Sequence, residues 1–183
     1  MDTAPLPARD RILRTAHNLF YRDGIRATGV DRLIAESGVA KLTFYRHFSS
    51  KDDLVRAFLD YRHERWMAWF VDALGRHGAV AGGGLAPLVT TMAEWFASPT
   101  FRGCAFINSV VEMGGSLTGV ADTALRHKQD MVQVIADLLP DTDDARAVAD
   151  AAALAVDGAM VRAQMGQTAV ALSGLGRVLA ALG

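Results

Sequence analysis

The sequence predicts an all-α protein in which three short N-terminal helices and a long fourth helix precede a body of further helices. Its composition is that of a globular chain, because 51% of the 183 residues are hydrophobic and 21% are charged. Apolar side chains recur at helical spacing, and no segment of useful length alternates as a β-strand does. Glycine and proline separate the apolar segments and mark the expected helix ends.

The first helix is predicted from near Pro7 to about Asp23. Its apolar residues have the i, i+3, i+4, i+7 spacing of a buried stripe: Ile12, Leu13, Ala16, Leu19 and Phe20. Gly24 is expected to end this helix as a left-handed C-terminal cap.

The second helix is predicted to begin at the sequence TGVD and to end at Gly38. Thr28 and Asp31 have the spacing of a capping box in which Asp replaces the usual Glu. The inward-facing residues are expected to be Val30, Leu33 and Ile34. A helix of about eight residues is too short to be stable alone, so it must pack on its neighbours.

The third helix is predicted at roughly residues 40–47, directly after the turn at Gly38. Phe44 and Phe48 are four residues apart and therefore lie on one side of it. Two short helices joined by a glycine-containing turn form a helix-turn-helix. Together with the first helix they make the smallest unit that buries all three apolar stripes.

The fourth helix is predicted at Lys51–Leu74, after a capping box formed by Ser50 and Asp53. At 1.5 Å per residue it is roughly 36 Å long, which suits a connection between an N-terminal domain and the body. Further helices are predicted at residues 85–97, 103–113, 119–139, 141–166 and 168–182.

Nothing in the sequence predicts secretion or membrane insertion. The N-terminal residues contain an acid at position 2 and lack the apolar region of a signal peptide. Glycine and proline interrupt the longest uncharged segment, so no transmembrane helix is expected. Cys104 is the single cysteine, which excludes an intrachain disulfide. We therefore expect a cytoplasmic protein in which Cys104 is inert packing.

Charge is unevenly distributed along the chain. Residues 1–51 contain nine Lys and Arg residues but five Asp and Glu, although the whole chain has a net charge of −1. A basic N-terminal part on an acidic body indicates that one part meets a polyanion while the other does not.

The segment GVAKLTFYRHFSSKDDL at residues 38–54 concentrates this positive charge. It has two interpretations, an ordinary solvated helix face or a surface that meets an anionic partner. No acid lies between Ser37 and Ser50, and Leu42 and Tyr45 share the polar face of the third helix. Helix N-termini, which bind phosphate, also cluster here. These features favour double-stranded DNA, with the third helix in the major groove.

The segment ATGVDRLIAESGVAKLTFYRHFSSKDDL resembles the N-terminal domain of TetR-family transcriptional regulators. The positions that match the family pattern are Thr28, Val30, Leu33, Ser37, Gly38, Val39, Thr43, Phe44, Tyr45, His47, Phe48, Ser50, Lys51, Asp52 and Leu54. Three positions depart from it, namely Gly29, Ala40 and Leu42. The resemblance implies a DNA-binding domain at residues 1–52 and a ligand-binding and dimerisation domain at residues 53–183.

Roles on DNA can be assigned to individual residues of this segment. Lys41 and Thr43 are expected to read base edges, with Leu42 against a thymine methyl group. By resemblance and by their places at helix ends, the phosphate contacts are expected from Thr28, Tyr45, His47 and Lys51. Arg46 reaches either backbone or base.

The last two predicted helices carry stripes of small and apolar residues. One stripe comprises Ala151, Leu154, Ala155, Gly158 and Val161, and the other Val170, Leu175, Val178, Leu179 and Leu182. The stripes pack either within one chain or, as the resemblance implies, in a four-helix bundle of a homodimer. A dimer would place two third helices on an inverted-repeat operator.

The resemblance also implies a small-molecule effector, and the aromatic and Met residues of the body indicate an apolar one. The candidate ligand-binding residues are Trp66, Phe70, Met92, Trp95, Phe96, Phe106, Asn108, Glu112 and Met113. Each aromatic or Met residue alone is more readily explained as core. Asn108 and Glu112 interrupt an apolar helix on one face and need polar partners, from a ligand or from the protein.

The sequence suits a DNA-binding regulator better than an enzyme. The leading prediction is a ligand-responsive repressor, and the alternative is a DNA-binding regulator that is independent of ligand or controlled by a partner. An enzyme is not expected, because the sequence contains no G-x-S-x-G, H-E-x-x-H, P-loop or dinucleotide fingerprint. No cofactor and no metal are predicted.

Overall fold

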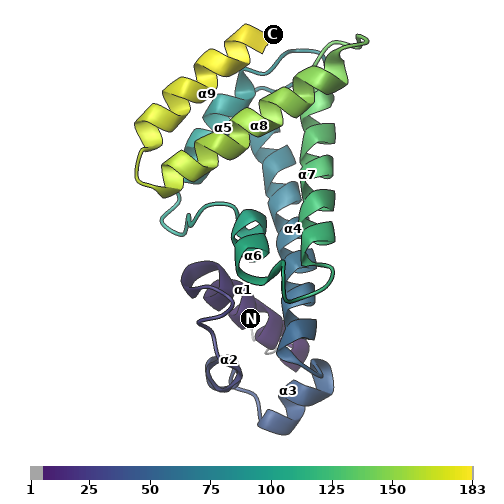
Figure 1. Ribbon diagram of the computed structural model, residues 1–183, viewed down its shortest axis with the longest axis vertical. Helices are drawn as coiled ribbons and strands as arrows, with labels where there is room; N and C mark the ends of the chain where they lie inside the picture. Colours follow the sequence, from purple (N-terminus) through teal and green to yellow (C-terminus); the bar gives the residue numbers. More distant parts are fainter. Residues whose placement is uncertain (1–5, 183) are drawn as a thin grey trace, which may run out of the picture. The chain divides into compact units, whose positions relative to one another are not determined.

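The computed structural model describes residues 6–182, which form nine α-helices and no strand (Figure 1). The all-α prediction is therefore confirmed for this part of the chain. The helices are α1 (Ala8–Asp23), α2 (Val30–Ser37), α3 (Lys41–His47), α4 (Lys51–Arg76), α5 (Pro87–Phe96), α6 (Ala105–Met113), α7 (Val120–Ala136), α8 (Ala145–Gln164) and α9 (Thr168–Leu182). The first residues of the segment used to exclude a signal peptide lie outside the described residues.

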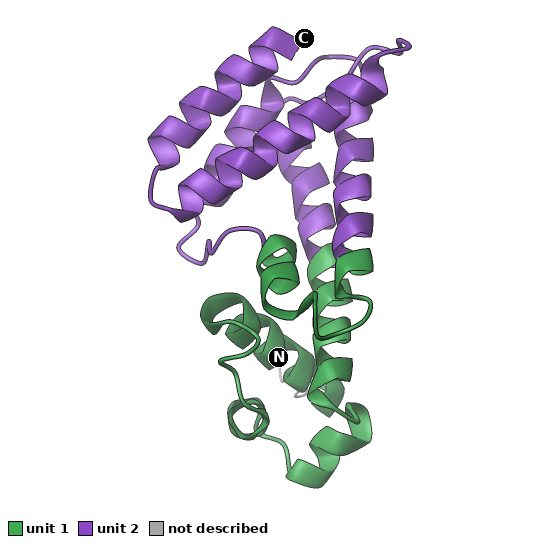
Figure 2. Ribbon diagram, in the orientation of Figure 1, with its two compact units in different colours: residues 1–63, 105–123 green, residues 64–104, 124–183 purple. Residues whose placement is uncertain are grey.

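The chain forms two compact units (Figure 2). Unit 1 comprises residues 1–63 and 105–123, and unit 2 comprises residues 64–104 and 124–183. Unit 1 therefore contains α6 as well as the three N-terminal helices. The division at residue 52, which is a functional boundary implied by the resemblance, stays a prediction.

Helix α1 buries the five apolar residues that its spacing predicts, Ile12, Leu13, Ala16, Leu19 and Phe20. Gly24 ends it with a positive φ of 94°, and its N–H donates to the carbonyl oxygen of Phe20. The expected left-handed cap is wrong in detail, because ψ is 154°. This extended positive-φ region is open essentially to glycine alone.

Helix α2 begins without the predicted capping box. Gly29 occupies the N-cap position and no side chain caps the helix. The Thr28 hydroxyl instead donates to the carbonyl oxygen of Gly24 at 2.7 Å, and Thr28 is 0% exposed. Leu33 is buried as expected, whereas Val30 and Ile34 are half-buried. Gly38 ends the helix in the left-handed conformation, with φ 62° and ψ 37°.

Helices α3 and α4 keep most of the predicted local features. Phe44 and Phe48 are buried, and their ring centroids are 6.4 Å apart. The Ser50 hydroxyl accepts the N–H of Asp53 at 3.1 Å, which confirms the cap of α4. The Asp53 carboxylate accepts the hydroxyl of Ser49 rather than completing the box. Helix α4 ends two residues after the predicted Leu74.

The two long helices predicted on either side of Pro140 are shorter than expected. Helix α7 ends at Ala136 and α8 begins at Ala145. Leu138 and Leu139 are buried in a turn, where their N–H groups donate to carbonyl oxygens three residues back. The carbonyl oxygen of Leu138 accepts the N–H of Gly84 at 2.8 Å. This tertiary bond satisfies a carbonyl group that lies beyond the end of α7 and has no helical partner.

In unit 2, α8 packs along α9 (Figure 1). The residues that α8 buries are Ala149, Ala152, Ala153, Val156, Ala159, Met160 and Ala163. None of the five α8 residues predicted as a packing stripe is buried in the single chain. Among the described residues, no helix is both long and apolar enough to cross a membrane.

Candidate nucleic-acid interface

Helix α3 has one buried face and one face that is open to solvent. Phe44 is fully buried, whereas Lys41, Arg46 and His47 are exposed and Thr43 is half-buried. Two apolar side chains share the open face, with Leu42 73% and Tyr45 42% exposed. Exposed apolar groups among cations suit a surface that touches bases as well as phosphates.

The buried face of α3 is held by its own aromatic residues and by α1. The Phe44 ring meets the Tyr45 ring edge-on, with centroids 5.4 Å apart. The Arg9 guanidinium of α1 lies 5.3 Å from the centroid of Phe48, a cation–π contact. The Arg11 side chain donates to the carbonyl oxygen of Gly38, in the turn between α2 and α3, at 3.5 Å. These contacts fix the direction in which the open face points.

Two of the predicted phosphate-binding residues are engaged inside the protein. Thr28 is buried, as described above, so its hydroxyl is not presented to a phosphate in this structure. The half-buried Lys51 ammonium donates to the carbonyl oxygen of Ile25 at 2.6 Å and lies 6.0 Å from the Phe20 ring centroid. Burial lowers the pKa of Lys51. Both residues hold the loop between α1 and α2.

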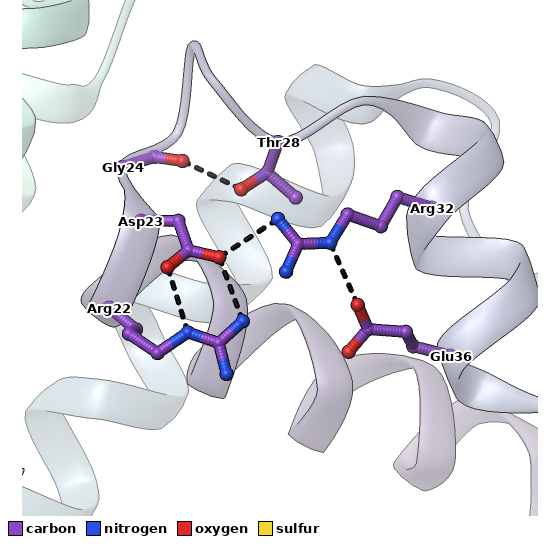
Figure 3. Close-up of polar contacts among 6 residues, drawn as sticks. All are labelled: Arg22, Asp23, Gly24, Thr28, Arg32 and Glu36. Carbon is purple, nitrogen blue, oxygen red and sulfur yellow. Dashed lines mark hydrogen bonds and ion pairs between the residues drawn. The ribbon is translucent and has the colours of Figure 1, made fainter.

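A salt-bridge network between α1 and α2 was not predicted from the sequence (Figure 3). Asp23 lies between two guanidinium groups, accepting bonds from Arg22 at 2.7 and 2.8 Å and pairing with Arg32 at 2.8 Å. Arg32 also donates to Glu36 at 2.7 Å. The hydrogen bond from Arg22, followed by that from Arg32, lowers the pKa of Asp23 to about 2. Two cations of the basic N-terminal part are thereby paired with acids.

The candidate ligand-binding residues are distributed over both units. Unit 2 contains Trp66, Phe70, Met92, Trp95 and Phe96, which are all buried. The Trp66 ring stacks on Phe70 with centroids 4.7 Å apart, and it meets Trp95 edge-on at 5.5 Å. Unit 1 contains Phe106, Asn108, Glu112 and Met113, of which Phe106 is buried and the other three are half-buried.

Unit 2 also has a pocket of about 490 Å³ that the sequence did not predict. Its lining contains none of the candidate ligand-binding residues, being formed by Gly82, Gly83, Gly84, Leu85, Ala86, Val89, Leu139, Pro140, Gly176, Leu179 and Ala180. Cys104 is buried, in keeping with a packing role. Within residues 6–182, no three His, Cys, Asp or Glu side chains are grouped so that they could hold a metal ion.

Comparison with known proteins extends these observations. The sequence model for bacterial regulatory proteins of the tetR family matches residues 12–58. The chain is 30% identical over 116 residues to the HTH-type transcriptional repressor ComR of Escherichia coli strain K12, a match that covers 63% of this chain and 55% of ComR. It is 31% identical over 70 residues to the HTH-type transcriptional regulator UidR of the same strain, covering 38% of this chain and 36% of UidR. The chain thus spans about half or less of these curated relatives.

Solved structures match over nearly the whole chain. The crystal structure of a TetR-family transcriptional regulator from Streptomyces coelicolor has a TM-score of 0.83 at 34% identity, covering 98% of this chain and 91% of that one. A TetR transcriptional regulator from Chloroflexus aurantiacus shares the fold, with a TM-score of 0.75 at 23% identity over 95% of this chain and 92% of that one. The extended similarity to the Streptomyces regulator, together with the matching helix-turn-helix, shows that the chain belongs to the TetR family of bacterial DNA-binding transcriptional regulators, which are not enzymes.

Proposed function

We propose that this regulator is a repressor that binds an inverted-repeat operator as a homodimer and is released by a small, apolar effector. The observation that carries the proposal is the open face of α3, where Lys41, Leu42, Tyr45, Arg46 and His47 are exposed together. A repressor role is supported by the similarity to ComR, which is named a transcriptional repressor. Because DNA is its target, we also propose a cytoplasmic location.

In the proposed complex, α3 lies in the major groove. Lys41 donates to the O6 and N7 atoms of a guanine, and Leu42 contacts a thymine methyl group. Thr43 is half-buried and reaches a base edge only in a close approach. Tyr45, His47 and Arg46 contact phosphates, which position the helix without reading the sequence. We assign Thr28 and Lys51 to the support of the α1–α2 loop.

The dimer is proposed through α8 and α9. Leu154 on α8 is 73% exposed, and Val170 and Val178 on α9 are 60% and 46% exposed. A monomer would leave these apolar side chains in water, whereas two copies of the helix pair would cover them in a four-helix bundle. Packing within a single chain does not explain the predicted α8 stripe, because none of its residues is on the buried side of α8. A second copy of the chain is therefore the occupant that we propose.

The effector site is proposed within the aromatic cluster of unit 2. The indole N–H of Trp66 and the hydroxyl of Thr91 are buried and have no hydrogen-bond partner among the described residues. Thr91 lies one turn before Trp95 on the buried face of α5, and Trp95 contacts Trp66. Buried polar groups without partners are costly. A mainly apolar ligand with a hydrogen-bond acceptor would satisfy these donors.

The first test is selection of binding sites from a random DNA pool. The proposal expects an inverted repeat whose half-sites lie about one helical turn apart. Sedimentation of the free protein and of its complex with the selected duplex then gives the number of chains bound. Recovery of no preferred sequence, or of a single half-site bound by one chain, would contradict the proposed dimer on an inverted repeat.

The second test separates the ligand-responsive regulator from the ligand-independent alternative. A thermal-shift screen of apolar compounds that carry a carbonyl or carboxyl group should find one that raises the melting temperature, because binding to the folded state stabilises it. The same compound should release the selected duplex. A protein that is stabilised by none of these compounds would favour the alternative regulator. Thr91→Val, which replaces the unpartnered hydroxyl with a methyl group of similar size, should weaken effector binding and leave DNA affinity unchanged.

A further inference from the structure

The loop between α1 and α2 is bonded to the end of α6, although the two segments are 86 residues apart in the chain. The backbone N–H of Arg26 donates to Oε2 of Glu112 at 2.9 Å. In return, the Arg26 side chain donates through Nε to the backbone carbonyl oxygen of Glu112 at 2.6 Å. Both segments belong to unit 1. The pair of reciprocal bonds fixes the position and the direction of the Arg26 backbone on α6.

Gly24 is shaped for this contact. A Cβ atom added to Gly24 would lie 3.2 Å from Oε2 and 3.3 Å from Oε1 of Glu112. Any larger residue would push the carboxylate away from the Arg26 N–H, or move the loop. The glycine therefore allows the carboxylate to approach the backbone closely, in addition to allowing the positive φ of 94°.

The Arg26 side chain satisfies a carbonyl group that α6 itself leaves without a helical partner. Glu112 lies in the last turn of α6, which ends at Met113. The last four carbonyl groups of a helix have no N–H partner within it, and the C-terminal end of the dipole attracts a cation. The guanidinium of Arg26 meets both requirements at the Glu112 carbonyl oxygen.

The same loop is anchored from its other side. Ile25 is 1% exposed, and its carbonyl oxygen accepts the bond from Lys51, the first residue of α4. The negative charge of Glu112 favours the charged form of the Lys51 ammonium, opposing the effect of burial on its pKa. The loop thus lies between a cation of α4 and an anion of α6, and it leads directly into α2 of the helix-turn-helix.

We propose that Glu112 and Arg26 form a latch that makes α6 part of the DNA-reading unit and positions the helix-turn-helix for the duplex. In this role Glu112 acts through the Arg26 backbone and touches no DNA. Glu112 is therefore a positioning residue, although it was one of the candidate ligand-binding residues predicted from the sequence. The inference rests on the proposed role of α3 in reading DNA.

Three variants test the latch. Glu112→Ala removes the acceptor, whereas Glu112→Gln removes the charge and keeps a side-chain oxygen that accepts the Arg26 N–H. Glu64→Ala, at an exposed glutamate of α4, is the charge-matched control. For each variant, amide hydrogen exchange of residues 24–28 is measured in the free protein, and affinity for the selected duplex is measured by fluorescence anisotropy at fixed salt. Melting temperatures show whether each variant is folded.

The latch predicts that Glu112→Ala speeds exchange at Arg26 and weakens DNA binding, each by about tenfold, as expected for loss of a charge-assisted hydrogen bond. Glu112→Gln and Glu64→Ala should stay within about threefold of the wild type. Unchanged exchange at Arg26 in Glu112→Ala would overturn the latch. Tighter DNA binding by both Ala and Gln would also overturn it, because Glu112 would then act by repelling phosphate. If the wild type binds no duplex, the proposed function fails, while the exchange measurement still decides on the latch.

Discussion

Replacement of Gly24 by alanine tests the backbone on which the helix-turn-helix depends. Gly24 has φ 94° and ψ 154°, in a region that other residues enter at a cost of roughly 1–3 kcal/mol. The added Cβ also meets the Glu112 carboxylate at 3.2 Å. We therefore expect Gly24→Ala to destabilise the protein by about 2 kcal/mol, which corresponds to roughly 4–8 °C in melting temperature for a chain of this size.

Two other glycines of the same unit provide matched comparisons. Gly38 has φ 62° but no atom within 4 Å of an added Cβ, so Gly38→Ala should cost about 1 kcal/mol from backbone strain alone. Gly29 has φ −77° and an equally open Cβ position, so Gly29→Ala should change stability by less than about 0.5 kcal/mol. The three substitutions add the same methyl group, so their order isolates the local geometry.

The assay is urea unfolding of the three variants at one protein concentration, because a dimer makes apparent stability depend on concentration. The double variant Gly24→Ala with Glu112→Ala separates the two contributions to the Gly24 effect. Without the carboxylate the methyl group has room, so the double variant should lose less stability than the two single variants together. Equal costs at Gly24 and Gly38, or strict additivity with Glu112, would refute the reasoning from close approach.

Three further predictions concern reading, assembly and pH. Lys41→Ala should change the sequence recovered from a random DNA pool, and an unchanged consensus would remove Lys41 from the base-reading residues. Leu154→Glu should sediment as a monomer, whereas Val71→Glu, at an exposed valine of α4, should sediment like the wild type. Because Asp23 has its pKa lowered from 3.8 to about 2, its stabilising effect is complete above pH 3.8 and is lost as the pH falls towards 2. The difference in urea midpoint between wild type and Asp23→Asn should narrow over that range, and a constant difference would exclude the carboxylate as its cause.

Short-range patterns predicted the helices that position the interface. The five buried residues of α1 could be predicted from their apolar spacing alone, because an amphipathic helix packs its apolar face against the rest of the protein. The cap at Ser50 depends on a hydroxyl and an N–H three residues away, so the sequence contains both partners. The open face of α3 could be predicted for the same reason, since burial of Phe44 fixes where the other side chains point.

Partners that are distant in the chain were not predictable in this way. The Thr28 hydroxyl could either cap α2 or donate to the carbonyl oxygen of Gly24. It donates to Gly24, whose carbonyl group is oriented by the unusual backbone angles of that residue. The pattern around Glu112 indicated that a polar partner was needed but could not identify it. That partner is a backbone N–H that only the folded loop presents. Asp23 and Arg32 likewise meet because α2 packs on α1.

These contacts also show that much of the basic N-terminal part is engaged within the protein. Among its nine Lys and Arg residues, several are bonded within unit 1: Arg9 to an aromatic ring, Arg11 and Lys51 to carbonyl oxygens, Arg22 and Arg32 to acids, and Arg26 to the end of α6. Lys41 and Arg46 are exposed, and neither forms an ion pair with an acid among residues 6–182.

Each phosphate that a protein neutralises contributes about −0.9 to the salt slope of binding. A cation that is already bonded to a carboxylate contributes less than its formal charge, because the pair is close to neutral from the distance of a phosphate. This reduction applies to Arg22 and Arg32, which pair with Asp23 and Glu36, whereas the exposed Lys41 and Arg46 of α3 keep their full contribution. Two cations and two exposed apolar side chains, Leu42 and Tyr45, therefore lie together on the open face of α3.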